Sequence, residues 1–182
     1  GLMEYGMDIH PTPISALRLA QTKAFQIMDD EDLDPSYKIA LKKEVDDYIW
    51  VAETQKKNIE KQSYYKLYLT EYYSTLARIY LYLIASGYEE YRDLGDNAYR
   101  SALTLSEGGM QVFVLYGYGS FLSFTEPSNT QKIEDIATRL VNSPQQTRDI
   151  FDKFIKNTLN LKDKDKGYRW IVLFSKSSPT FD

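Results

Sequence analysis

Apolar residues recur at helical spacing along most of the chain, and prolines mark where the first two helical segments begin. Thr12-Pro13 and Asp34-Pro35 each place a capping side chain directly before a proline, which is typical of a helix start. The sequence therefore predicts a first helix from Pro13 and a second from Pro35. The apolar pattern of the second helix weakens over residues 55–62, where we expect a bend or an end.

The strongest apolar stripe in the chain lies between residues 67 and 84, where tyrosine, leucine and isoleucine cover most of the helix circumference. A helix that is apolar nearly all round belongs in the middle of a bundle. Ser63 is the predicted cap of this helix, and Gly87 is its predicted end. Another helix is expected over residues 88–105, with its inward side formed by Tyr91, Leu94, Ala98 and Ala102.

The second half of the chain contains two ambiguous segments. Residues 110–124 include Val-Phe-Val, which favours a strand, and glycines that disfavour a regular helix. The one candidate partner strand is 168–174, so we predict a buried helix at 110–124 and leave 168–174 open between helix and strand. Capping patterns at Ser128 and Ser143 predict two further helices. A loose arm at 1–10 and a loose tail at 177–182 complete the expected organisation.

These elements predict an all-α fold, either a bundle or a short helical-repeat array of six to eight helices. The 182 residues fit a single domain, 1–182, and no low-complexity linker divides them. Hydrophobic residues make up 43% of the chain and charged residues 26%, which is the balance of a globular protein.

Composition removes several classes of chemistry. The chain has no cysteine, which excludes disulfides, thiolate catalysis and cysteine-bound zinc. The net charge of −4 lacks the basic footprint of nucleic-acid binding and argues against a nucleic-acid partner. No apolar run is long enough to span a membrane and no signal peptide is visible, so a cytoplasmic location is the default expectation. The chain begins at Gly1 rather than methionine, which is compatible with a trimmed targeting segment.

No motif specifies a catalytic centre or a cofactor, and none is predicted. His10 is the one histidine and is expected on the surface. The acidic run at 29–34 has alternate aspartates like a calcium loop, but Pro35 and Leu41 stand where a glycine and a glutamate are required. We therefore interpret the run as a solvated turn between helices.

Two carboxylate pairs support an alternative function as a magnesium-dependent phosphohydrolase. Glu44 with Asp47 and Glu90 with Asp93 each stand three positions apart, so each pair can share one helix face. This spacing is similar to the metal site of all-helical nucleotide pyrophosphohydrolases. The resemblance implies four metal ligands if the two helices face each other.

The helix pair at residues 72–105 resembles one tetratricopeptide-type hairpin. Leu76-Ala77 followed by Tyr80 matches the family's first helix, and Tyr99 with Ala102 matches the end of its second. The family's proline after the second helix is absent. The resemblance implies a helical array that binds peptides or partner proteins.

Tyrosine is the compositional outlier, with 16 residues against eight phenylalanines and two tryptophans. Tyrosine suits interfaces because it joins an apolar ring to a polar tip. Our leading hypothesis is therefore a non-catalytic protein–protein interaction module or assembly subunit, whose partner is another protein or a second copy. Its candidate contacts lie off the main apolar stripe, at Tyr64, Tyr65, Tyr68 and Tyr82.

Lysines beside these tyrosines leave a third hypothesis open, a helical subunit of a nucleoprotein complex. The mixed segment contains Lys56, Lys57, Lys61 and Lys66 around Tyr64 and Tyr65. Aromatic rings among lysines can stack on the bases of a single strand.

Overall fold

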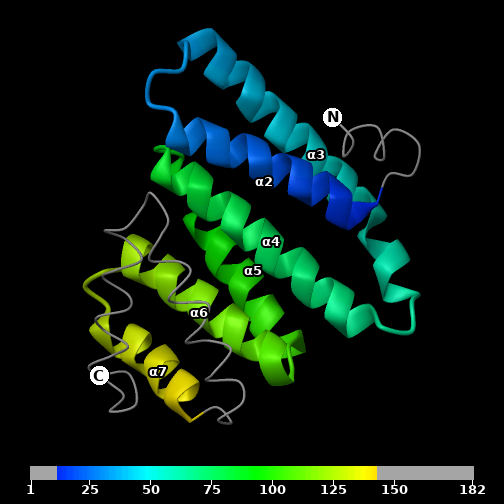
Figure 1. Cartoon of the computed structure of the whole chain (residues 1–182), viewed down its shortest axis with the longest axis vertical. Helices are drawn as coiled ribbons and strands as arrows, with labels where there is room; N and C mark the ends of the chain where they lie inside the picture. The colour runs from blue at the N-terminus through cyan, green and yellow to red at the C-terminus, as the bar shows by residue number, and fades with distance from the viewer. Residues whose placement is uncertain (1–11, 143–182) are drawn as a thin grey trace. The chain divides into compact units, whose positions relative to one another are not determined.

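The computed structural model describes residues 12–142, except for the side chain of Val141, and this part of the chain is helical with no strand. The all-α prediction is confirmed. The chain divides into two compact units, Gly1–Leu105 and Ser106–Asp182, and each is described by itself (Figure 1). The sequence has no linker composition at this division, and the single domain 1–182 stays a prediction.

The first unit is a layer of four packed helices. Helix α2 contacts both α3 and α4, and α5 packs against α4 (Figure 1). Leu76, Ile79 and Leu83 of α4 are buried, as the strong apolar stripe predicts. The elements are α2 (Pro13–Asp29), α3 (Pro35–Glu60), α4 (Tyr65–Ala85), the 3-10 turn η1 (Glu89–Tyr91) and α5 (Arg92–Leu105).

The first two helix starts are confirmed. Thr12 and Ser15 form a reciprocal capping box at the start of α2. The Asp34 carboxylate accepts hydrogen bonds from the backbone N–H groups of Ser36 and Tyr37 at the start of α3. The Ser36 hydroxyl also donates to this carboxylate, and these hydrogen bonds hold the pKa of Asp34 below its usual value.

The predicted end of α4 is also confirmed. Gly87 has φ +101°, a left-handed conformation that glycine adopts without steric cost. The N–H of Tyr88 donates to the carbonyl of Leu83, and the N–H of Gly87 donates to that of Ile84. These two bonds form a Schellman motif, which satisfies the last carbonyls of the helix.

Helix α3 ends at Glu60, inside the stretch 55–62 where a bend or an end is expected, and the buried Ile59 anchors its last turn. Two local predictions for the first unit are wrong. The N-cap of α4 is Tyr64 rather than Ser63. Leu94 is exposed rather than inward, and Gly95 and Tyr99 are buried instead. The 3-10 turn η1 turns by more degrees per residue than an α-helix, which rotates the face that α5 buries.

The second unit contains two described helices that pack together, α6 (Gly108–Thr125) and α7 (Thr130–Val141). The helix predicted at 110–124 is confirmed. The cap of α7 is Asn129, whose side chain accepts from the N–H of Lys132, and not Ser128. The helix predicted after Ser143, the segment 168–174, the tail 177–182 and the arm 1–10 lie outside the described residues.

Candidate partner-binding surface

Three of the four predicted contact tyrosines gather where α3 turns into α4. Tyr64 is 72% exposed, Tyr65 is 40% exposed and Tyr68 is 39% exposed. Leu67 beside them is also exposed. We call this surface the α3–α4 corner, and it consists of Lys56, Lys57, Lys61, Tyr64, Tyr65, Lys66, Leu67 and Tyr68.

Two buried residues fix the corner from either side. Ile59 ends α3 in the core, and Leu69 begins the buried face of α4. Between them the N–H of Gln62 donates to the carbonyl of Ile59, and the N–H of Tyr65 donates to that of Gln62. This short turn leaves the tyrosines outside the core, because the buried stripe of α4 starts only at Leu69.

Tyr64 stands at a position where its side chain gives the helix no support. It is the N-cap residue of α4, and it makes no capping hydrogen bond. Serine, threonine, aspartate and asparagine are the residues that stabilise this position. The most exposed tyrosine of the corner therefore occupies a position at which a different residue type would stabilise the fold more.

The corner is locally basic in an acidic chain. Residues 54–68 contain four lysines and one glutamate, whereas the whole chain carries a net charge of −4. Lys56 is held by Tyr73, with its ammonium 3.2 Å from the hydroxyl oxygen and 5.5 Å from the ring centroid. Lys57 and Lys61 are exposed and make no ion pair with any described residue.

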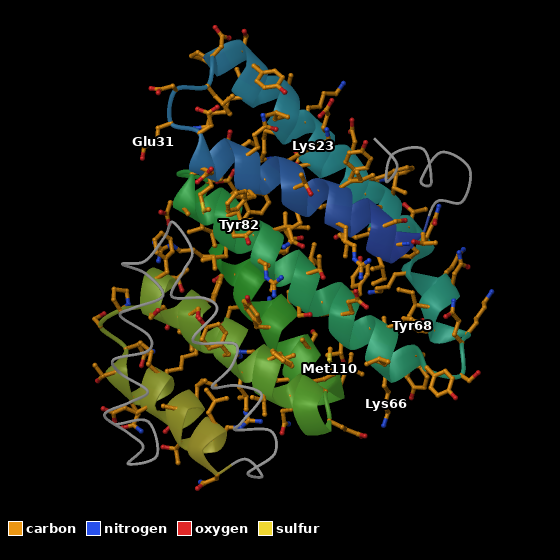
Figure 2. All side chains as sticks on the ribbon, in the orientation of Figure 1. Lys23, Glu31, Lys66, Tyr68, Tyr82 and Met110 are labelled. Carbon is orange, nitrogen blue, oxygen red and sulfur yellow. The ribbon has the colours of Figure 1, made fainter. Side chains whose placement is uncertain are left out.

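Tyr82, the fourth predicted contact, does not belong to the corner. It lies toward the other end of α4, away from Tyr68 (Figure 2). Its ring meets that of Phe25 edge to face, with the centroids 5.5 Å apart. This packing between α2 and α4 gives Tyr82 a structural role within the first unit.

The four carboxylates of the phosphohydrolase hypothesis are not gathered into a metal site. Glu44 pairs with Lys23 at 2.9 Å, and Asp47, Glu90 and Asp93 are exposed. Over residues 12–142, no group of three or more His, Asp or Glu side chains is placed to hold a metal ion. This statement also covers the acidic run, where Asp30 accepts from the N–H of Asp32 and Asp34 caps α3. His10 lies outside the described residues.

Sequence reasoning missed an aromatic and acidic cluster around Lys42 of α3. The Lys42 ammonium is 2.8 Å from both carboxylate oxygens of Asp46 and 2.6 Å from the hydroxyl oxygen of Tyr91. It also lies 5.2 Å from the ring centroid of Tyr88 and 4.9 Å from that of Tyr91. Tyr91 in turn stacks on Tyr80 at 5.3 Å.

Burial alone would lower the pKa of Lys42, but the hydrogen bonds to Asp46 and Tyr91 outweigh it and raise the pKa. Lys42 therefore stays charged and fills the space between the tyrosine rings. Because the chain's own ammonium occupies this cluster, the cluster joins α3 to the turn before α5 and is not open to a ligand. Lys42 and Tyr91 are far apart in the sequence, so no local sequence pattern predicts their contact.

Sequence reasoning also missed two exposed apolar residues on α3. Ile39 is 69% exposed and Trp50 is 66% exposed. They stand eleven positions apart, which is three helical turns, so they share one side of α3. Their exposure could have been recognised from the sequence, because both residues fall outside the inward stripe of Leu41, Val45 and Ile49.

Comparisons with protein-family models, with curated proteins and with solved structures find no match to this chain. None of the helices between residues 12 and 142 has the length and apolar character needed to cross a membrane.

Proposed function

We propose that this chain is a non-catalytic protein–protein interaction module, or a subunit of a larger assembly, that uses the α3–α4 corner as its contact surface. The single observation that carries the proposal is Tyr64, which is 72% exposed at a helix N-cap where it forms no capping bond. Positions that break a local stability rule without local compensation are candidates for function.

The composition of the corner supports this proposal. Tyrosine is enriched in protein interfaces, and its ring adds contact area with little loss of side-chain freedom. Three exposed tyrosines and Leu67 share the corner with two lysines that have no described ion-pair partner. Such a surface combines apolar area with a charge that orients a partner. The resemblance of residues 72–105 to a tetratricopeptide hairpin stays a prediction, and we retain it as part of the proposal.

The test compares the variant Tyr64→Ser with Leu94→Ser in the full-length chain. Both substitutions remove an exposed, largely apolar side chain from the same unit, but only the first changes the corner. Each tagged protein is used to capture cross-linked partners, which are quantified by mass spectrometry against the wild type. We expect Tyr64→Ser to lower recovery of the specific partner at least tenfold, as a hot-spot tyrosine does.

As a background control, an unrelated helical protein is carried through the same capture. The wild-type chain has to recover its partners in larger amounts than this protein does. Equal recovery of every partner by wild type and Tyr64→Ser would contradict the corner as the contact surface. Loss of a partner with Leu94→Ser alone would move the contact to α5 and would also contradict it.

A further inference from the structure

One whole side of α3 is exposed from the start of the helix to its end. Helix α3 lies at the edge of the first unit and packs mainly against α2 (Figure 1). Exposed residues follow one another at three- and four-residue spacing, which places them on one face about 38 Å long. The face consists of Ser36, Ile39, Lys43, Asp47, Trp50, Thr54, Lys57 and Lys61.

The two ends of this face carry opposite charge. The last residue of α2 and the loop before α3 are acidic, at Asp29, Asp30, Glu31, Asp32 and Asp34, all of them exposed. The other end is the basic α3–α4 corner. Figure 2 places Glu31 at one end of α3, and Lys66 and Tyr68 at the opposite end. The length of α3 separates them by several times the distance of about 8 Å over which salt screens charge, so they do not neutralise each other within one chain.

Local helix stability does not explain the acidic end. Asp34 caps α3, and lysines near a helix C-terminus are favoured by the helix dipole. Asp29 and Asp30, however, stand at the C-terminal end of α2, where negative charge is unfavourable. The carboxylates of Asp29 and Glu31 make no hydrogen bond or ion pair with any described residue. The chain therefore keeps unpaired acidic charge at a place where it weakens a helix.

We propose that a second copy of this chain packs antiparallel along the exposed face of α3, about a twofold axis. An antiparallel pairing brings the acidic loop of each copy to the basic α3–α4 corner of the other. Opposite charges then face each other at both ends of the contact. It also brings the exposed Ile39 and Trp50 of each copy into the middle of the contact. A surface that is complementary to itself under a twofold rotation is the requirement for a symmetric dimer.

This inference rests on the proposed function and names its partner.

The size of the exposed face sets the expected affinity of the dimer. A helix face about 38 Å long and about 10 Å wide offers roughly 400 Å² per copy, to which the corner and the loop add. Interfaces below about 1,200 Å² in total are typical of weak association. We therefore expect a dimer that dissociates in the micromolar range, and that weakens as salt rises because its ends are charged.

The test is sedimentation velocity of the full-length chain from about 1 to 300 µM at low and high salt. One variant reverses the loop, Glu31→Lys with Asp32→Lys, and a second reverses the corner, Lys57→Glu with Lys61→Glu. Each variant alone places its reversed charges against unchanged charges of the same sign at both contacts, so we expect at least a tenfold weaker dimer. In an equal mixture, an unchanged loop meets an unchanged corner at one contact and the reversed residues meet each other at the second, so we expect a tighter dimer than with either variant alone.

The controls are Arg78→Glu and Glu134→Lys, two exposed charges outside this face, which should leave the dimer unchanged. Circular dichroism on every variant identifies any that fails to fold. If a reversal variant fails to fold, Trp50→Lys at the centre of the face takes its place and should also weaken the dimer.

Four results would overturn the inference. The first is a wild-type chain that stays monomeric at 300 µM, and the second is a dimer whose affinity neither reversal changes. The third is a mixture of the two variants that dimerises no more tightly than either variant alone. The fourth is assembly of the wild type into species larger than a dimer. A fluorescent oligo-dT strand is titrated in parallel, and binding of this strand by a monomeric chain would assign the corner to nucleic acid instead. A monomeric chain that still loses a captured partner with Tyr64→Ser would leave the proposed function standing and end only the dimer.

Discussion

The ammonium of Lys42 in α3 lies 2.6 Å from the hydroxyl oxygen of Tyr91 in η1, and 4.9 Å from the centroid of the same ring. The ammonium is also paired with Asp46 one turn along α3. A single lysine thus connects two elements through an ion pair, a hydrogen bond and ring contacts. Its side chain is only 15% exposed, so solvent screens these interactions less than on an open surface.

Lys42→Met is expected to lower the free energy of unfolding by about 1–2 kcal/mol. Methionine keeps the length of the side chain but removes the hydrogen bonds and the cation–π contacts, which are together of this size. Lys43→Met is the matched control, because Lys43 is exposed on the neighbouring position, and its effect should stay within about 0.5 kcal/mol. Urea denaturation at neutral pH measures the free energy of unfolding of both variants. Equal losses of stability in the two variants would contradict the role of Lys42.

The pH dependence of the Lys42 contribution has a definite sign. Because folding raises the pKa of Lys42, its contribution is fully present below the unfolded value of about 10.4 and is lost as pH rises through the folded pKa. The difference in stability between wild type and Lys42→Met should therefore be the same at pH 6 and pH 8. A difference that shrinks between these two pH values would show that another group is responsible.

Tyr72→Phe is expected to stabilise the chain by about 1 kcal/mol. Tyr72 of α4 is 1% exposed, and its hydroxyl oxygen is buried with no hydrogen-bond partner in the described part of the chain. An unsatisfied buried hydroxyl is unfavourable by about 1–3 kcal/mol, and phenylalanine keeps the ring without it. Burial also raises the pKa of Tyr72 well above its usual value.

Tyr91→Phe is the opposite case and serves as the control. The hydroxyl of Tyr91 accepts from Lys42 and donates to Asp46, so its removal should destabilise the chain. Chemical denaturation measures the change in the free energy of unfolding for both variants. A loss of stability with Tyr72→Phe would mean that the hydroxyl has a partner, such as a buried water molecule.

Tyr64→Ser should raise stability even though the proposed function expects it to weaken partner binding. Serine at the N-cap can accept a hydrogen bond from the first turn of α4, which is worth about 0.5–1 kcal/mol. Tyr68→Ser is the comparison, because Tyr68 lies inside α4 and offers no capping position. Thermal unfolding should show a higher midpoint for Tyr64→Ser and no increase for Tyr68→Ser. A lower midpoint for Tyr64→Ser would mean that the tyrosine has a local structural role.

The sequence predicts those features that depend on neighbouring residues. Thr12 and Asp34 precede prolines and cap α2 and α3, and Gly87 ends α4, because each of these roles involves residues within one helical turn. The central position of α4 also follows from its pattern, since a helix that is apolar nearly all round has to be buried.

Features that depend on tertiary contacts were not predictable. Lys42 looks like an ordinary surface lysine of an amphipathic helix, and only the fold brings Tyr88 and Tyr91 to it. An unbroken helix over residues 88–105 would place Leu94 inward, but the turn η1 changes the phase of α5 and leaves Leu94 exposed. Of the four tyrosines proposed as contacts from the sequence, three are exposed together at the α3–α4 corner. Tyr82 differs because its partner Phe25 belongs to another helix.

The carboxylate of Asp34 gives the start of α3 a pH-dependent contribution. Hydrogen bonds from Ser36 and Tyr37 lower the pKa of Asp34, so the contribution is present above the unfolded value of about 3.9 and is lost as pH falls through the folded pKa. Asp34→Asn keeps a capping side chain but has no charge to lose. The stability advantage of wild type over Asp34→Asn should therefore be larger at pH 7 than at pH 2.5. Asp34→Ala removes the cap at every pH and should be less stable than Asp34→Asn at both values. If wild type and Asp34→Asn lose stability in parallel on acidification, as followed by urea denaturation, the ionised cap does not contribute in this way.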